Sequence, residues 1–318
     1  MANKYSDLID QTFYFPQEGF DLEDGYLTFN EVPMKYLIEK YGTPLKLTYL
    51  PKIGKQIKKA RNLFRRAMRS LGYAGKYHYC YCTKSSHFAH VVDEVLDHEA
   101  KLELSSTYDV LLVRRLFEQG KISKDIVIVC NGFKPNDYLA AICSLINDGF
   151  TNVIPVVDNA HELDYYEQHV TVATTGIGIR VATEEEPNFE FYTSRLGIRG
   201  ADVINLFNDR IKDNPKFKMR MLHFFVDTGI KDSLYYWGEL RKAATLYSEL
   251  KKVSDNLHAL NIGGGMPIRN SLGFEFDYKY MVREIVNNIL VTCEENEVPE
   301  PDLFTEFGKY TVGESGAT

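Results

Sequence analysis

Beyond residue 44, short runs of β-branched and aromatic residues alternate with longer amphipathic segments, and this alternation limits the possible folds more than any other feature. Strands that alternate with helices imply a parallel sheet. Eight such units in roughly 250 residues match a closed (β/α)8 barrel of the TIM type, whereas an open doubly wound sheet usually has fewer strands. The predicted strands are Tyr77–Thr83, Lys101–Ser105, Asp125–Cys130, Asn152–Val157, Gly176–Ala182, Met219–Val226, Leu257–Ile262 and Asp302–Thr305.

The segments between these runs have the apolar spacing of helices. Between residues 232 and 254, Leu234, Leu240, Ala243, Ala244 and Tyr247 recur at helical intervals, which predicts one buried face. The predicted helices include Ser86–His98, Tyr108–Glu118, Asn136–Asp148, Asp232–Ser254 and Tyr278–Glu295.

Residues 1–44 are interpreted as a leader, and residues 45–318 as the barrel. Within the leader, Gly25–Val32 is expected to form a short strand. Pro33–Tyr41 is expected to form a helix, because proline is favoured in the first turn. The sequence Gly-Thr-Pro at 42–44 marks the start of the regular pattern.

Charge and hydropathy exclude several classes of partner. The net charge of −7 and the pI near 5.7 argue against nucleic acid or an anionic membrane surface, because no basic surplus exists to bind phosphates. The basic run at 55–69 contains Leu63 and Phe64, so it is interpreted as an amphipathic helix with a solvated face. No apolar run approaches the roughly 18 residues of a membrane span. Asp7 and Asp10 lie where a secretion signal would be apolar.

The cysteines indicate the compartment. Five cysteines are an odd and sparse set, which favours reduced thiols in a cytoplasmic protein. Cys80 and Cys82 have no second pair of cysteines or histidines at the spacing of a zinc finger. No metal site is therefore predicted.

The first strand ends at a lysine. In a barrel of this kind the reactive groups gather where the strands end, and Lys84 follows the strand Tyr77–Thr83. Burial would lower the pKa of this amine and leave it able to bond to a carbonyl carbon. The alternative is a lysine that extends from the strand end to solvent.

The seventh and eighth strands end in a glycine triplet and a glutamate. Gly263, Gly264 and Gly265 let backbone N–H groups approach an anion, although a bare triplet is also compatible with a flexible turn. Glu306 lies in the barrel mouth and needs a cationic partner. That partner is either a protonated ring nitrogen of a ligand or Arg180, in a simple ion pair without any ligand.

These residues occur in an order that resembles a known family. The ordered segments are YGTPLKLTYL (41–50), the strand that ends in Lys84, LELSS (102–106), CNGFK (130–134), SRLGI (194–198), LHFF (222–225), IGGGMP (262–267) and EFGK (306–309). They resemble the decarboxylases of the alanine-racemase-like barrel fold that depend on pyridoxal 5′-phosphate (PLP). The arginine, ornithine and diaminopimelate decarboxylases are such enzymes. CNGFK and LHF are most similar to the biosynthetic arginine decarboxylases, and the resemblance spans roughly residues 41–316.

Carried over position by position, the resemblance implies roles for individual residues. It implies that Lys84 holds PLP covalently and that Glu306 keeps the pyridine nitrogen protonated. Glu103 matches an acidic position near the cofactor, and Arg180 an arginine that reaches toward the ring. The positions that match the phosphate site and its surroundings are Thr228, Gly263, Gly264, Gly265, Gly308 and Lys309.

Three positions depart from the family pattern. The imidazole that stacks on the pyridine ring is replaced by Phe225, because His223 lies two residues earlier. A phenyl ring stacks but does not titrate. The family's EPGR reads EFGK here, so Lys309 offers a point charge where arginine would offer a fork. The family's Gly-Ser reads Asp227-Thr228, which leaves a hydroxyl for phosphate but requires Asp227 to turn away.

The resemblance implies decarboxylation of a basic amino acid, with arginine converted to agmatine in polyamine biosynthesis. Ornithine, lysine, diaminopimelate and carboxynorspermidine remain alternative substrates or substrate classes. In the family a C-terminal β-domain supplies a cysteine and an aspartate across a homodimer interface, and these groups bind and reprotonate the substrate. No such segment follows residue 318 in this sequence. We therefore expect residues 1–318 alone to bind PLP but to decarboxylate poorly.

Two other readings compete with this one. A single-domain barrel that binds PLP with little catalysis fits the same cofactor residues. A metal-dependent barrel hydrolase would need clusters of histidine and aspartate at the strand ends, and His223 with Asp227 alone does not form one.

Overall fold

The structure is a computed structural model, and it describes residues 19–183, 196–269 and 274–317. Residues 194–195 of the SRLGI segment and residues 1–18 of the predicted leader lie outside the described residues.

Eight parallel strands form a closed barrel, which confirms the predicted fold class. The barrel closes where the last strand pairs with the first, through Glu306 opposite Cys80. All eight strands overlap the ranges expected from the sequence, with ends that differ by a few residues. They are β5 (Tyr77–Cys82), β6 (Lys101–Leu104), β7 (Ile128–Cys130), β8 (Val153–Val157), β9 (Thr175–Val181), β10 (Phe217–Phe224), β11 (Ala259–Asn261) and β12 (Asp302–Glu306).

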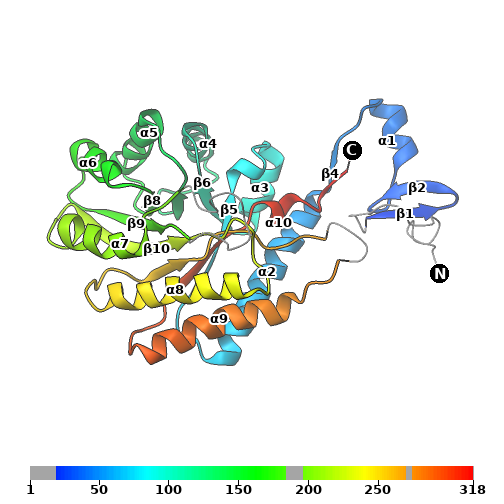
Figure 1. Cartoon of the computed structure of the whole chain (residues 1–318). Helices are drawn as coiled ribbons and strands as arrows, with labels where there is room; N and C mark the ends of the chain where they lie inside the picture. Colours follow the sequence, from blue (N-terminus) through cyan, green and yellow to red (C-terminus); the bar gives the residue numbers. More distant parts are fainter. Residues whose placement is uncertain (1–18, 184–195, 270–273, 318) are drawn as a thin grey trace, which may run out of the picture.

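Helices surround the barrel (Figure 1). The basic run forms part of α2 (Leu50–Leu71), which buries Ile53, Ile57 and Phe64 and leaves most of its lysines and arginines exposed, as expected. The five predicted helices are all present, and α6 and α7 were not anticipated. The other helices of the ring are α3 (Ala89–Asp97), α4 (Thr107–Glu118), α5 (Asn136–Asn147), α6 (Ala160–His169), α7 (Gly200–Leu206), α8 (Leu234–Lys251) and α9 (Tyr278–Glu295).

The chain between β5 and α3 differs from the prediction in a way that shapes the barrel mouth. A helix was expected from Ser86, but a 3-10 turn, η2 (Thr83–Ser85), follows the strand directly. Phe88 is extended, so α3 begins only at Ala89. Lys84 therefore lies in a tight turn at the carboxyl end of β5.

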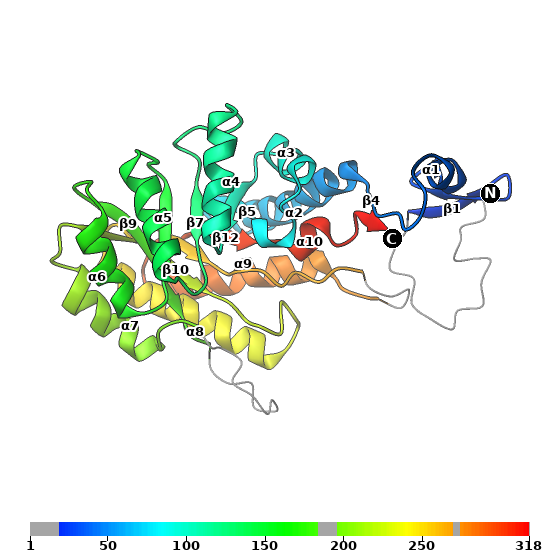
Figure 2. The same ribbon diagram turned by 90° about the horizontal axis from the view of Figure 1, so that it is seen from above.

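Residues before the barrel form a small antiparallel sheet and a helix. The expected strand Gly25–Val32 was wrong in its extent, because Asn30 and Glu31 have φ of 49° and 70° and form a turn. Figure 2 shows this part beside the barrel, near the C-terminus of the chain. Its elements are β1 (Phe20–Glu23), β2 (Tyr26–Phe29), β3 (Val32–Pro33) and α1 (Met34–Tyr41).

The two ends of the predicted barrel region pair with each other. The strand β4 (Leu47–Thr48) is antiparallel to β13 (Gly316–Ala317), which follows the short helix α10 (Lys309–Val312). The division into a leader at 1–44 and a barrel at 45–318 stays a prediction.

Two further findings concern the described residues as a whole. All five cysteines are buried and unpaired. Among the described helices, none has the length and apolar character needed to cross a membrane.

Candidate active site

Three charged side chains from neighbouring strands converge at the mouth of the barrel. Lys84 extends from η2, and its Nζ lies 3.7 Å from Oε1 of Glu103 on β6. Glu306 is the last residue of β12. Because β5 lies between β6 and β12 and pairs with both, these side chains come from three adjacent strand ends.

The charge state expected for Lys84 was wrong. Burial does lower the pKa of this amine, but the electrostatic influence of Glu103, Cys82 and Glu306 together outweighs burial and raises it above its usual value. The free amine is therefore an ammonium group held by a carboxylate. Its side chain is 58% exposed, so a ligand that enters the mouth can reach it.

Glu103 is fully buried, and neither of its carboxylate oxygens has a hydrogen bond among the described residues. Burial raises the pKa of this carboxyl, and the negative charge of Glu306 raises it further, while Lys84 lowers it. A buried carboxyl without hydrogen bonds is costly. The site therefore favours a ligand that brings a hydrogen-bond donor or a positive charge near Glu103.

Glu306 is buried but well supported. Asn261 Nδ2 donates to its Oε1 at 2.7 Å, and Asn131 Nδ2 donates to its Oε2 at 3.2 Å. His223 Nε2 also lies 3.2 Å from Oε2. Burial raises the pKa of Glu306, but His223, Lys84 and Asn261 lower it below its usual value. Glu306 is therefore an ionised carboxylate, and the alternative Glu306–Arg180 ion pair is replaced by the contact with His223.

Arg180 instead lies against an aromatic ring. Its guanidinium carbon is 6.0 Å from the centre of the Phe225 ring, a distance at which a cation and a ring face attract each other. Arg180 is buried, and Phe225 is half-buried. His223 pairs in register with Arg180 on one side and with Asn261 on the other, so three polar side chains follow one another around the barrel.

The glycine loop has no room for side chains. A Cβ on Gly263 would lie 2.8 Å from the Phe225 ring, and one on Gly264 would lie 2.5 Å from the backbone oxygen of Glu306. Gly263 and Gly265 have φ of 65° and 90°, which favours glycine. The N–H of Gly263 donates to Asn261 Oδ1 at 2.9 Å. Among the described residues, Gly264 and Gly265 thus keep backbone N–H groups for an anion.

The loop after β10 packs directly on the glycine loop. The N–H of Ile230 donates to the Gly265 carbonyl at 3.0 Å, and Gly229 contacts Gly265 so closely that neither accepts a Cβ. This contact brings half-buried Thr228 to the glycine loop. Asp227 is exposed, as its position next to a phosphate site would require.

Gly308 and Lys309 complete the mouth on the side of β12. A Cβ on Gly308 would clash with Ser85 and would lie 2.9 Å from the Cβ of Cys82. Glycine at this position therefore lets the η2 turn, and with it Lys84, pack against the end of β12. Lys309 is exposed at the start of α10.

Several buried polar atoms around these side chains lack partners among the described residues. Besides both oxygens of Glu103, these are Oδ1 of Asn131, Nδ1 of His223 and Oδ1 of Asp158. Buried polar groups in proteins are nearly always hydrogen-bonded. Their concentration at one end of the barrel indicates a site built for a polar ligand.

The residues that support Glu306 were not predicted from the sequence. Asn131 and Asn261 stand inside or directly after apolar strand segments, where an uncharged polar residue is unusual, and this was the available signal. His223 was noted as the neighbour of the stacking position and, with Asp227, as too little for a metal cluster, but not as a partner of Glu306. His223 is 83 positions from Glu306 in the sequence, and Asn131 is 175 positions from it. Their contacts with Glu306 therefore depend on closure of the barrel.

A second unanticipated group lies beneath the loop after β7. Lys134 is buried, and its Nζ contacts Glu162 Oε2 at 3.0 Å and donates to the Val156 carbonyl at 2.6 Å. It also donates to the Gly132 carbonyl at 3.0 Å. One ammonium thus ties the CNGFK loop to β8 and α6.

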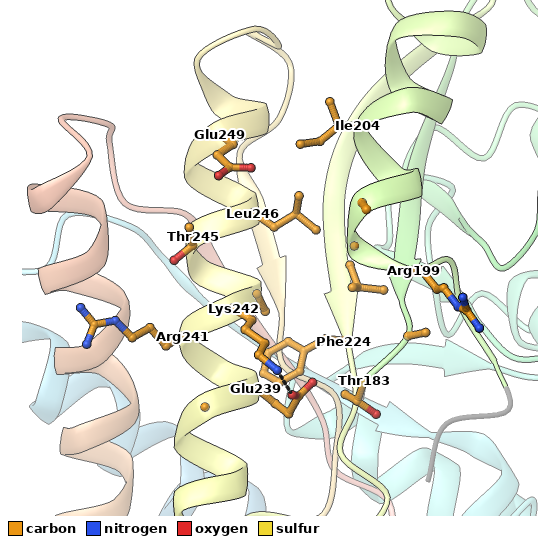
Figure 3. Close-up of a pocket in the computed structure, with 16 residues that line it drawn as sticks. Thr183, Arg199, Ile204, Phe224, Glu239, Arg241, Lys242, Thr245, Leu246 and Glu249 are labelled. Carbon is orange, nitrogen blue, oxygen red and sulfur yellow. Dashed lines mark hydrogen bonds and ion pairs between the residues drawn. The ribbon is translucent and has the colours of Figure 1, made fainter. Parts of the chain in front are cut away.

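A cavity of about 1200 Å³ lies elsewhere, between α7, α8 and the end of β9 (Figure 3). Arg199 and Thr183 line one wall, and Lys242 and Glu239 on the other form an ion pair of 3.0 Å. None of the predicted site residues lines it. Because its lining carries none of the converging groups described above, we place the candidate active site at the strand ends.

Comparisons with known proteins agree with the barrel fold. The family described as pyridoxal-dependent decarboxylase, pyridoxal binding domain, matches residues 54–313. The biosynthetic arginine decarboxylase of Escherichia coli K12 is 26% identical over 261 residues, which are 77% of this chain and 39% of that protein. Biosynthetic arginine decarboxylase 2 of Synechocystis is 23% identical over 295 residues, 85% of this chain and 44% of that protein.

Solved structures share the fold at lower identity. The biosynthetic arginine decarboxylase of Campylobacter jejuni has a TM-score of 0.76 and 20% identity, covering 94% of this chain and 52% of that chain. The diaminopimelate decarboxylase of M. jannaschii in complex with L-lysine has a TM-score of 0.78 and 16% identity, covering 95% and 69%. The chain spans less than half the length of the curated relatives it matches.

Proposed function

Because this chain belongs to the pyridoxal-dependent decarboxylase family through its pyridoxal-binding domain, we propose that the protein decarboxylates arginine to agmatine. Its cofactor is PLP. The observation that carries the proposal is the convergence of Lys84, Glu103 and Glu306 at three adjacent strand ends. The choice of arginine rests on the names of the curated relatives and on the CNGFK and LHF segments.

The described residues fit this cofactor. Lys84 would hold it covalently, since its amine follows β5 directly and its side chain is 58% exposed at the mouth. Glu306, ionised and fixed by two amides, has lone pairs left to accept a hydrogen bond from a protonated ring nitrogen. The unpartnered oxygens of Glu103 would accept a hydrogen bond from a donor group of the cofactor.

The phosphate would lie over the glycine loop. Gly264 and Gly265 offer backbone N–H groups, Thr228 offers a hydroxyl from the adjoining loop, and Lys309 offers a positive charge from α10. Gly263 lets the Phe225 ring pack against the glycine loop, and Gly308 lets the η2 turn pack against the end of β12. Arg180 and Phe225 would form the wall beside the ring, with the phenyl ring stacking in place of an imidazole.

The chemistry that PLP supplies when bound is an electron sink for the bond to the departing carboxylate. The residues of this chain prepare that chemistry. Glu306 holds a proton on the ring nitrogen, because its own low pKa keeps it negative. The carboxylate of Glu103 keeps the amine of Lys84 in place.

Borohydride reduction of the PLP-loaded protein, followed by peptide mapping, tests the cofactor site. We expect the pyridoxyl group on Lys84 and its loss in Lys84→Ala. Lys309→Ala is the matched control, because it should lower PLP affinity yet leave the label on Lys84. A label on another lysine would contradict the assignment.

A panel of substrates tests the specificity. Arginine, ornithine, lysine, diaminopimelate and carboxynorspermidine are each supplied to the full natural chain, and amine and carbon dioxide are measured. Release from arginine alone supports the proposal, and preferential release from another substrate reassigns the specificity. PLP binding without release from any of them would favour the single-domain binding protein. A homodimer and a cytoplasmic location stay predictions.

A further inference from the structure

Two buried carboxyls share the barrel mouth. Glu103 on β6 and Glu306 on β12 lie on either side of β5, and both are buried. Burial raises the pKa of Glu103 to about 7, and the negative charge of Glu306 adds to this effect. When two carboxyls share an enclosed site, one keeps its charge and the other is protonated more easily. The choice between them decides where the mouth offers a negative partner to a ligand.

The lysine at the mouth favours a charge on Glu103. Lys84 Nζ is 3.7 Å from Glu103 Oε1, whereas no lysine or arginine contacts Glu306 among the described residues. An ion pair alone would therefore keep the charge on Glu103. Lys84 is exposed to solvent, so water screens this attraction. The charge on Glu306 needs a different cause.

His223 supplies that cause. Its side chain is fully buried, and its Nε2 lies 3.2 Å from Oε2 of Glu306. Asn131 Nδ2 donates to the same oxygen at 3.2 Å and lies 3.1 Å from Nε2. A carboxylate oxygen only accepts hydrogen bonds, so Nε2 carries a proton and donates it to Oε2. With Asn261 on Oε1, Glu306 has three donors, whereas neither oxygen of Glu103 accepts a hydrogen bond from a described residue.

The groups around this pair do not replace the imidazole. Among the described residues, His223 is the only basic side chain in contact with the Glu306 carboxylate. The thiols of Cys80 and Cys82 are buried, and burial raises their pKa, so they stay neutral. The charged groups that surround the pair without such a contact are Lys84 on η2, Glu103 on β6, Asp158 after β8 and Arg180 on β9.

We propose that His223 is a positioning residue that fixes the negative charge of the mouth on Glu306, so that Glu103 takes up a proton first as the pH falls. The inference rests on the proposed function, because the charge on Glu306 matters through the ring nitrogen that it would face. Without the imidazole, the burial of Glu306 is less well compensated. Glu306 then takes up the proton, and Glu103 stays ionised beside Lys84. The net charge of the mouth is the same in both cases.

Infrared spectroscopy of the cofactor-free protein tests where the proton goes. The full natural chain is studied at pH 5, and the carbonyl band of protonated carboxyls is compared between variants. Burial by itself raises the pKa of Glu103, so we expect its band to remain in Glu306→Gln. The band should be lost in Glu103→Gln. Glu162, whose pKa is about 7, contributes equally to all these proteins and cancels in the differences.

Two substitutions of the imidazole separate its hydrogen bond from its bulk. His223→Asn carries an amide that is too short to reach Oε2, whereas the amide nitrogen of His223→Gln lies near the place of Nε2. In His223→Asn the protonated band should belong to Glu306, so the further change Glu306→Gln should remove it. His223→Gln should restore the band of Glu103. His161→Asn is the matched control, because His161 on α6 is 96% exposed, and it should behave like wild type.

The visible spectrum of bound PLP across pH gives a second readout. A hydrogen bond to a charged group is worth roughly one to two pKa units. The ring nitrogen should therefore lose its proton at a pH about one to two units lower in His223→Asn than in wild type, the direction also expected for Glu306→Gln. His223→Gln and His161→Asn should titrate close to wild type. Covalent PLP on Lys84 should be retained in all of them.

The outcomes separate this inference from the proposed function. If no PLP attaches to Lys84, the proposed function fails, while the infrared comparison still locates the proton. If PLP attaches and His223→Asn titrates like wild type, the imidazole only fills space and the inference is wrong. The comparison of Glu103→Gln with Glu306→Gln requires no change at His223, so it decides even if His223→Asn does not fold. A band that remains in Glu103→Gln and is lost in Glu306→Gln would overturn the inference.

Discussion

The chemistry of this site depends on how one buried carboxylate is kept negative. Glu306 has no lysine or arginine in direct contact among the described residues, and instead receives bonds from Asn131 and Asn261 and lies beside His223. Neutral amides stabilise a carboxylate without cancelling its charge. The full charge therefore remains for a cation that enters with the ligand.

Replacement of Glu306 by glutamine tests this role. Glu306→Gln should retain covalent PLP on Lys84, because the amine and the phosphate loop are unchanged. It should weaken protonation of the ring nitrogen, because an amide does not hold a proton there. The visible spectrum of the bound cofactor, recorded across pH for both proteins, checks this. Identical titration of wild type and variant would show that Glu306 is not the partner of the ring nitrogen.

At the scale of elements, the barrel was predictable because each strand and helix has its own periodic signal. The strands β5 and β12 were located by their apolar runs, and Lys84 and Glu306 by their positions at the ends of these runs. The local structure that the sequence did not predict is set by close packing between elements. The turn η2 replaces the expected start of a helix because it packs against Gly308.

Contacts between side chains on different strands and loops of the barrel were also not predictable from the sequence. The contact between His223 and Glu306 joins β10 to β12, two strands that are separated by β11. The pair of His87 and Asp109 joins two βα loops, each of which reads as ordinary loop or helix sequence. Periodicity places a residue on a strand, but only the register of closed neighbours decides which side chains meet.

Gly308→Ala tests the packing between η2 and β12. The added methyl group would meet Ser85 and Cys82, so the turn must shift and carry Lys84 with it. A misplacement of about 1 Å can cost on the order of a hundredfold in rate. We expect PLP affinity to fall by about tenfold or more, with decarboxylation reduced further.

Gly238→Ala is the matched control for that variant. Gly238 lies within α8, and nothing occupies the space of an added Cβ within 4 Å. Alanine there should stabilise the helix by roughly 0.5–1 kcal/mol and leave PLP binding unchanged. Equal PLP affinity in wild type and Gly308→Ala, measured by absorbance titration, would contradict the packing argument.

For the whole molecule, buried carboxyls make stability depend on pH. Burial raises the pKa of Glu162 from 4.5 to about 7, partly offset by Lys134. The folded state thus favours the neutral acid. The stability from this group is fully present below pH 4.5 and is lost as pH rises to 7. Between pH 4.5 and 7 the contribution of Glu162 to the free energy of unfolding falls by about 3 kcal/mol. Glu103, whose pKa is also raised, acts in the same direction.

Glu162→Gln should therefore flatten the pH profile of the cofactor-free protein. Glutamine does not titrate, and Lys134 keeps its bonds to the carbonyls of Gly132 and Val156. Urea unfolding at pH 5, 6 and 7 gives the free energy of unfolding at each pH. Wild type should lose stability across this range by more than the variant. Glu118→Gln, an exposed change at the end of α4, should keep the wild-type slope. Equal slopes for wild type and Glu162→Gln would mean that Glu162 is already ionised in the fold, held by its contact with Lys134.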